Sequence, residues 1–70
     1  MTVQKFVTIN KERTDGVGIV SKYILEDPAF PWKYSTDYNR MQYITALKGQ
    51  LGYGAIQDFF TEFKSMRFEN

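Results

Sequence analysis

Two prolines three positions apart, Pro28 and Pro31, constrain the fold of this 70-residue chain more than any other feature. Each proline lacks an amide donor and restricts the residue before it, so residues 28–34 cannot continue a helix or a strand. We therefore expect a structured connection there, with regular elements before and after it.

Before the connection, apolar side chains recur every three or four positions, which is the period of a helix. The first predicted helix runs from an N-cap at Thr2 to about Arg13. Its apolar stripe consists of Val3, Phe6 and Val7, with Ile9 or Asn10 one turn further on.

The second predicted helix begins at Asp15 or Gly16, after turn-forming residues, and ends before Pro28. Its β-branched residues would also suit a strand, but their spacing favours a helix. The expected buried stripe consists of Val17, Val20, Ser21 and Ile24, widened by Ile19 and Tyr23.

After the connection, the third predicted helix has Ser35 or Thr36 as its N-cap and ends at Lys48 and Gly49, with Gly49 in the left-handed conformation. The side chains expected on its inner face are Tyr38, Met41, Ile44 or Thr45, and Leu47. The stretch 49–54 is interpreted as a turn and not as a phosphate-binding loop, because no strand precedes it and no Lys-Ser/Thr pair follows.

The last predicted helix follows Gly54 and has a largely aromatic apolar face. The residues that trace this face are Ala55, Ile56, Phe59, Phe60 and Phe63, followed by Met66 or Arg67. Four helices without repeats or linkers predict an all-α fold, a compact four-helix bundle that forms a single domain over residues 1–70. A domain this small, with no cross-links, is expected to have a free energy of unfolding of only about 3–5 kcal/mol.

The chain contains neither His nor Cys, so it lacks the commonest general base and the thiol nucleophile. A disulfide and a thiolate metal site are excluded, and we expect no catalytic residue, metal or cofactor. Asp58 and Glu62, four positions apart on the last helix, could face a divalent cation together. Two oxygen ligands do not make a hard-cation site, so a solvated acidic face is the better interpretation.

Nine Lys and Arg against eight Asp and Glu give a net charge of +1, which is too small to attract nucleic acid or anionic lipid through the whole surface. The first residues lack the apolar region of a signal peptide, and no apolar run approaches the roughly 20 residues that cross a bilayer. We therefore expect a soluble, cytoplasmic protein that does not bind membranes.

The motifs Phe-Pro at 30–31 and Ser-Thr-Asp-Tyr at 35–38 resemble those of the YozE family of small bacterial proteins. The family's aromatic first helix is matched by Phe6, and its second helix, which ends in Asp, by Val17, Val20 and Ile24 with Asp27. Its stretch containing Leu and Gly is matched by Leu47 with Gly49, and its last helix by Phe59 with Phe63. The chain departs from the family pattern by the additional Trp32 and by Phe63 in place of Trp. The resemblance implies a SAM-like helical fold, a bacterial, phage or mobile-element setting, and a function in binding protein or nucleic acid.

Six Phe, five Tyr and one Trp are many for so small a core, so some of these rings must lie near the surface. Trp32, Tyr34 and Tyr43 are the candidates for a protein-binding patch rimmed by charge, and an adaptor or regulator is the predicted function. The alternative is that Trp32 lies over the bundle and closes it.

A second hypothesis is nucleic-acid binding by the basic and aromatic segment 32–54, because cations can neutralise the backbone while flat rings stack on bases. The candidate residues are Lys33, Arg40 and Lys48, with Trp32 and Tyr34. The alternative for this segment is that the cations only solubilise the surface.

Overall fold

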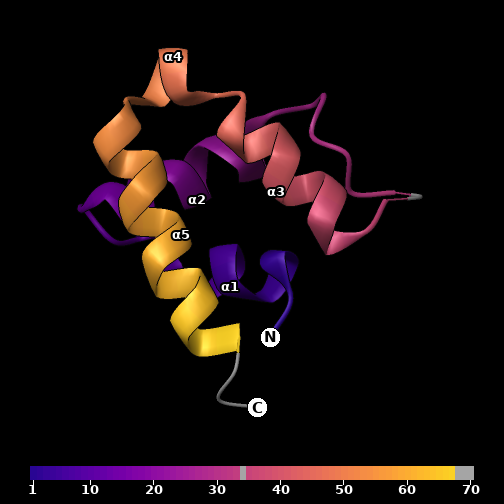
Figure 1. Cartoon of the computed structure of the whole chain (residues 1–70), viewed down its shortest axis with the longest axis horizontal. Coiled ribbons are helices and arrows are strands. Elements are labelled where there is room, and N and C mark those ends of the chain that lie inside the picture. The colour runs from indigo at the N-terminus through magenta and orange to yellow at the C-terminus, as the bar shows by residue number, and fades with distance from the viewer. Residues whose placement is uncertain (34, 68–70) are drawn as a thin grey trace.

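The computed structural model describes residues 1–33 and 35–67, and these residues form five α-helices and no β-strand (Figure 1). The helices are α1 (Val3–Asn10), α2 (Gly16–Glu26), α3 (Asp37–Thr45), α4 (Lys48–Leu51) and α5 (Tyr53–Arg67). The predicted all-α class is confirmed, and α2 is a helix and not a strand. The predicted four-helix bundle is not confirmed, because the short helix α4 occupies part of the expected turn and joins α3 to α5.

Side-chain oxygens cap three of these helices at their N-termini. Thr2, Asp15 and Thr36 each accept a hydrogen bond of 3.1–3.2 Å from the amide three residues further on. Each bond satisfies one of the amide donors that the start of a helix leaves open. The predicted cap at Thr2 is confirmed, and Asp15 and Thr36 are the caps among the alternatives for α2 and α3.

The core forms where α2 packs against both α1 and α5. Phe6 of α1 meets Phe59 and Phe63 of α5 edge-on, with ring centroids 5.3 Å apart in both pairs. Aromatic rings favour this geometry because the positive edge of one faces the negative face of the other. The buried apolar residues are Val3, Phe6, Val7, Val17, Val20, Ile24, Phe30, Ile44, Leu47, Ile56, Phe59 and Phe63. All of them except Phe30 lie on the predicted inner faces of the helices.

Two helices end earlier than predicted. α1 ends at Asn10 and not near Arg13, because the amide of Arg13 bonds to the carbonyl three residues back and tightens the chain into a turn. α3 ends at Thr45 for the same reason, since the amide of residue 47 also bonds three residues back. The left-handed residue is therefore Gly52, with a φ of 90°, and not Gly49.

Three side chains predicted to be buried are exposed. Tyr38 is 68% exposed, Ile19 is 49% exposed, and Tyr23 is also open to solvent. α1 and α5 cover one side of α2, which leaves Ile19 and Tyr23 outside the stripe. In α3 the inner positions of the first turns are Asp37 and Arg40, so Tyr38, about 100° further around the helix, points away.

Gly18 marks the closest approach between α2 and the turn that precedes it. A β-carbon at this position would lie 1.8 Å from the carbonyl oxygen of Arg13, which is a backbone atom and cannot rotate away. Gly16 is also tight, since its β-carbon would lie 3.0 Å from the Cα of Ala55 in α5. Glycine at these two positions lets α2 sit close to its neighbours.

Gly18→Ala should therefore lower the free energy of unfolding by about 3 kcal/mol or more, at the upper end of overpacking effects and comparable to the whole stability of so small a domain. Gly49→Ala is the matched control, because nothing lies within 4 Å of its added carbon. Chemical denaturation of the three proteins measures the difference. Equal stability of the wild type and Gly18→Ala would contradict this packing.

Candidate binding surface

The connection between α2 and α3 is organised around the ring of Phe30, which is buried. Trp32 packs against it with ring centroids 4.4 Å apart, and Tyr43 of α3 meets it edge-on at 5.1 Å. Both outer rings are half-buried. The structure thus brings together the candidates Trp32 and Tyr43 on a shared core residue, while Tyr34 lies outside the described residues.

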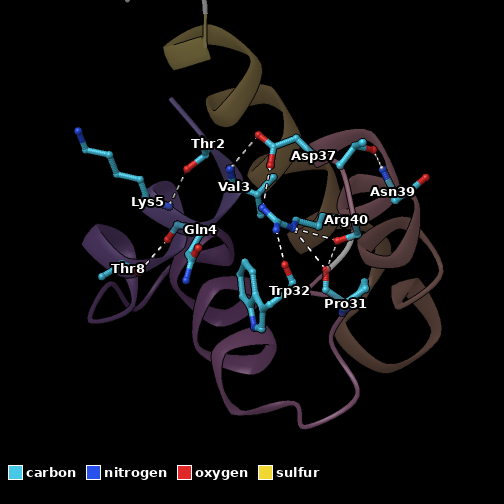
Figure 2. A network of polar contacts seen from close by, with 12 residues as sticks. Thr2, Val3, Gln4, Lys5, Thr8, Pro31, Trp32, Asp37, Asn39 and Arg40 are labelled. Carbon is cyan, nitrogen blue, oxygen red and sulfur yellow. Dashed lines mark hydrogen bonds and ion pairs between the residues drawn. The ribbon is translucent and has the colours of Figure 1, made fainter.

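Arg40 ties this connection to α3 (Figure 2). Its Nη2 donates to the carbonyl of Trp32 at 2.5 Å, its Nη1 donates to Asp37 Oδ1 at 3.2 Å, and its Nε lies 3.4 Å from the carbonyl oxygen of Pro31 and 3.3 Å from Ser35 Oγ. The guanidinium carbon also sits 5.3 Å from the centroid of the Trp32 ring, a cation–π distance. With its side chain only 14% exposed, Arg40 is engaged inside the protein.

The same network reaches α1 through Asp37. Its Oδ2 accepts a hydrogen bond of 3.2 Å from the backbone amide of Val3, in the first turn of α1. A carboxylate suits this place because the amides at a helix N-terminus carry partial positive charge. Asp37 therefore joins the start of α3 to the start of α1, and Arg40 fixes its orientation.

The three cations of the nucleic-acid hypothesis are not gathered on one surface. Lys33 and Lys48 are exposed at opposite ends of α3, and a nine-residue helix spans about 13 Å. Arg40 lies between them but directs its donors to internal acceptors. These residues do not form a continuous cationic track.

Tyr43 has its own polar partner. Its hydroxyl donates a 2.7 Å hydrogen bond to Asp27 Oδ2, and Asp27 Oδ1 accepts the amide of Ala29. The bond to Asp27 raises the pKa of Tyr43, because removing the phenolic proton would place two negative charges together. Asp27 thereby holds α3 against the end of α2.

Glu62 of α5 forms an ion pair with Arg13, which lies in the turn between α1 and α2. Arg13 donates to both oxygens of Glu62, at 2.5 and 3.1 Å, and also pairs with Asp15. The hydrogen bond from Arg13 lowers the pKa of Asp15. The carboxylates of Glu62 and Asp15 raise the pKa of Arg13, and the bond to Glu62 has the larger effect. Glu62 therefore binds α5 to the turn before α2. Within residues 1–33 and 35–67, no group of three acidic, His or Cys side chains is placed to hold a metal ion.

A surface that the sequence did not predict lies between α3 and α5. Two adjoining hollows, of about 320 and 270 Å³, share Thr45, Phe60 and Lys64 in their linings. The first also contacts Tyr53, Ile56, Gln57 and Thr61, and the second Tyr38, Met41 and Gln42. We call these ten residues the α3–α5 groove.

Three of the ten residues of the α3–α5 groove are aromatic. Tyr38 and Tyr53 line different hollows and are 68% and 69% exposed, whereas Phe60 is half-buried in both. Lys64 lies beside Phe60, with its Nζ 5.8 Å from the ring centroid. The exposure of Tyr53 could have been predicted from its position between two glycines. Tyr38 was missed because the sequence analysis assigned it to the inner face of α3.

No family model matches the chain, and neither a curated protein nor a solved structure matches it. The resemblance to the YozE family therefore remains a prediction. In the part of the chain that the structure describes, no helix has both the length and the apolar character needed to cross a bilayer.

The raised pKa of Tyr43 predicts a pH dependence. A group whose folded-state pKa exceeds its unfolded value of 10.0 contributes stability that is complete below pH 10.0 and is lost as the pH rises through the folded-state pKa. The titration of Tyr43 is the difference in tyrosinate absorbance between the wild type and Tyr43→Phe, and its midpoint should lie above pH 10.0. Asp27→Asn should bring that midpoint down, because it removes the carboxylate charge. A Tyr43 midpoint at or below 10.0 would show that the bond to Asp27 is absent in solution.

Proposed function

We propose that this protein is a non-enzymatic binding module that docks a segment of another protein in the α3–α5 groove. The observation that supports the proposal is the pair of exposed tyrosines, Tyr38 and Tyr53, that line two adjoining hollows around Phe60. Tyrosine is enriched at the energetic centres of protein interfaces, because it offers a large rigid ring and a hydroxyl at little cost in conformational entropy.

The proposal places the docking surface away from Trp32 and Tyr43. Both rings are packed on Phe30, Trp32 is covered by Arg40, and the hydroxyl of Tyr43 is bonded to Asp27. These groups stabilise the connection and have less to offer a partner. The exposed tyrosines have no such role in the described structure.

A protein partner fits the groove better than nucleic acid does. Binding to a phosphate backbone depends on several Lys or Arg side chains, and the described groove lining contains one, Lys64. An apolar floor with polar edges is instead the usual anatomy of a protein-binding site. The resemblance to the YozE family supports the remaining parts of the proposal, which are a SAM-like adaptor or regulator and a bacterial, phage or mobile-element cytoplasm as its setting.

The double variant Tyr38→Ala/Tyr53→Ala tests this function. Because both side chains are exposed, the changes should alter stability by no more than about 0.5 kcal/mol each. A partner captured by the wild type, identified and then purified should bind the variant at least about tenfold more weakly, as expected when two interface tyrosines are lost. Isothermal titration of the purified pair measures the affinities.

Ile9→Ala is the matched control, since Ile9 is an apolar residue on α1, 59% exposed, outside the groove. Equal affinities of the double variant and the wild type would exclude the α3–α5 groove. Binding of labelled oligonucleotides that is lost in Lys33→Ala/Lys48→Ala would replace the proposal with the nucleic-acid hypothesis.

A further inference from the structure

On the basis of the proposed function, we infer that the partner segment is an acidic amphipathic helix. Two apolar side chains, one helical turn apart, would enter the two hollows of the α3–α5 groove, and a carboxylate beside them would pair with Lys64. Three features of the described groove favour this occupant: its divided shape, its charge, and the backbone of its walls.

The shape of the groove fits neighbouring side chains on one face of a helix. The hollows adjoin each other, because Thr45, Phe60 and Lys64 line both. Side chains three or four positions apart on a helix are about 5–6 Å from each other, so they reach adjoining sites without a bend in the chain. Tyr38 and Tyr53 would then contact such a helix at separate points along its length.

The charge of the groove favours an acidic partner. Lys64 is the one charged residue among the ten described residues that line it, and it forms no ion pair within residues 1–33 and 35–67. Asp58 and Glu62, the acidic residues of α5 within its described part, line a different hollow with Asp15, and Glu62 is bound to Arg13. α5 thus separates its acidic side from the cation that faces the groove.

The walls of the groove favour a helix over an extended segment. An extended peptide gains most from pairing its backbone with the open edge of a sheet. The described residues contain no strand, and both walls are α-helices whose amides and carbonyls bond within the helix. A helical partner needs no backbone pairing, because its own hydrogen bonds are internal, so side-chain contacts with the groove are sufficient.

The test uses two synthetic peptides of about five helical turns. Each has Leu and Phe on one face, and the flanking charges are Glu in the acidic peptide and Lys in the basic peptide. The acidic peptide should bind the full chain about fivefold more tightly than the basic one at low salt, consistent with one or two exposed ion pairs. Its chemical-shift changes, measured on isotope-labelled protein, should map to Tyr38, Tyr53 and Phe60.

Lys64→Glu should reverse the preference between the two peptides. Lys5→Glu is the matched control, because it makes the same change of charge at an exposed position on α1 outside the groove, and it should preserve the preference. Circular dichroism verifies that both variants remain folded.

Equal binding of the two peptides, shift changes outside the groove, or an unchanged preference in Lys64→Glu would overturn the inference. Self-association of the chain that is lost in Tyr38→Ala/Tyr53→Ala would also overturn it, because a second copy would then be the occupant. If neither peptide binds while the double tyrosine variant still loses its purified partner, only the inference fails. If that partner binds the double variant normally, the proposed function fails as well.

Discussion

The arrangement of α3 and of the connection before it depends on the hydrogen bonds of the Arg40 guanidinium group. This group bonds to two backbone carbonyls of an irregular connection and to the carboxylate that reaches α1. A proline-rich connection cannot satisfy its carbonyls within a helix or a sheet, and each one left buried without a donor costs about 1–3 kcal/mol. A single planar side chain with five donors solves this problem, and in doing so it sets the rotation of α3 about its own axis.

That rotation links the core to the proposed function. With Asp37 and Arg40 turned inward, Tyr38 faces solvent, and the later part of α3 contributes Ile44 to the core. α4 and the left-handed Gly52 then carry the chain across to α5, which packs mainly on α2. α1 supports both helices, since Asp37 of α3 bonds to Val3 and Phe6 packs on α5, and the groove lies between α3 and α5 on the surface.

The sequence predicted α1, α2, α3 and α5 and most of the core, because these depend on local spacing, but it did not predict α4. Phe6, Ile44 and Phe59 each belong to a stripe of apolar residues that recurs at the helical period within its own helix. Thr2 is a cap residue directly before the helix that it starts. Arg40 could not be placed in this way, because its acceptors are loop carbonyls whose positions depend on the tertiary path of the chain. The groove was missed for a similar reason, since its lining comes from two helices, α3 and α5, whose relative placement is not a local property of the sequence.

Native-state hydrogen exchange in Arg40→Gln tests the central claim most directly. If Arg40 fixes α3, the amides of α3 should exchange much faster in the variant than in the wild type, while the amides of α2 and α5 keep their protection, because their phenylalanine and valine packing does not involve Arg40. Unchanged protection in α3 would contradict the account, since it would show that apolar packing alone holds the helix in place.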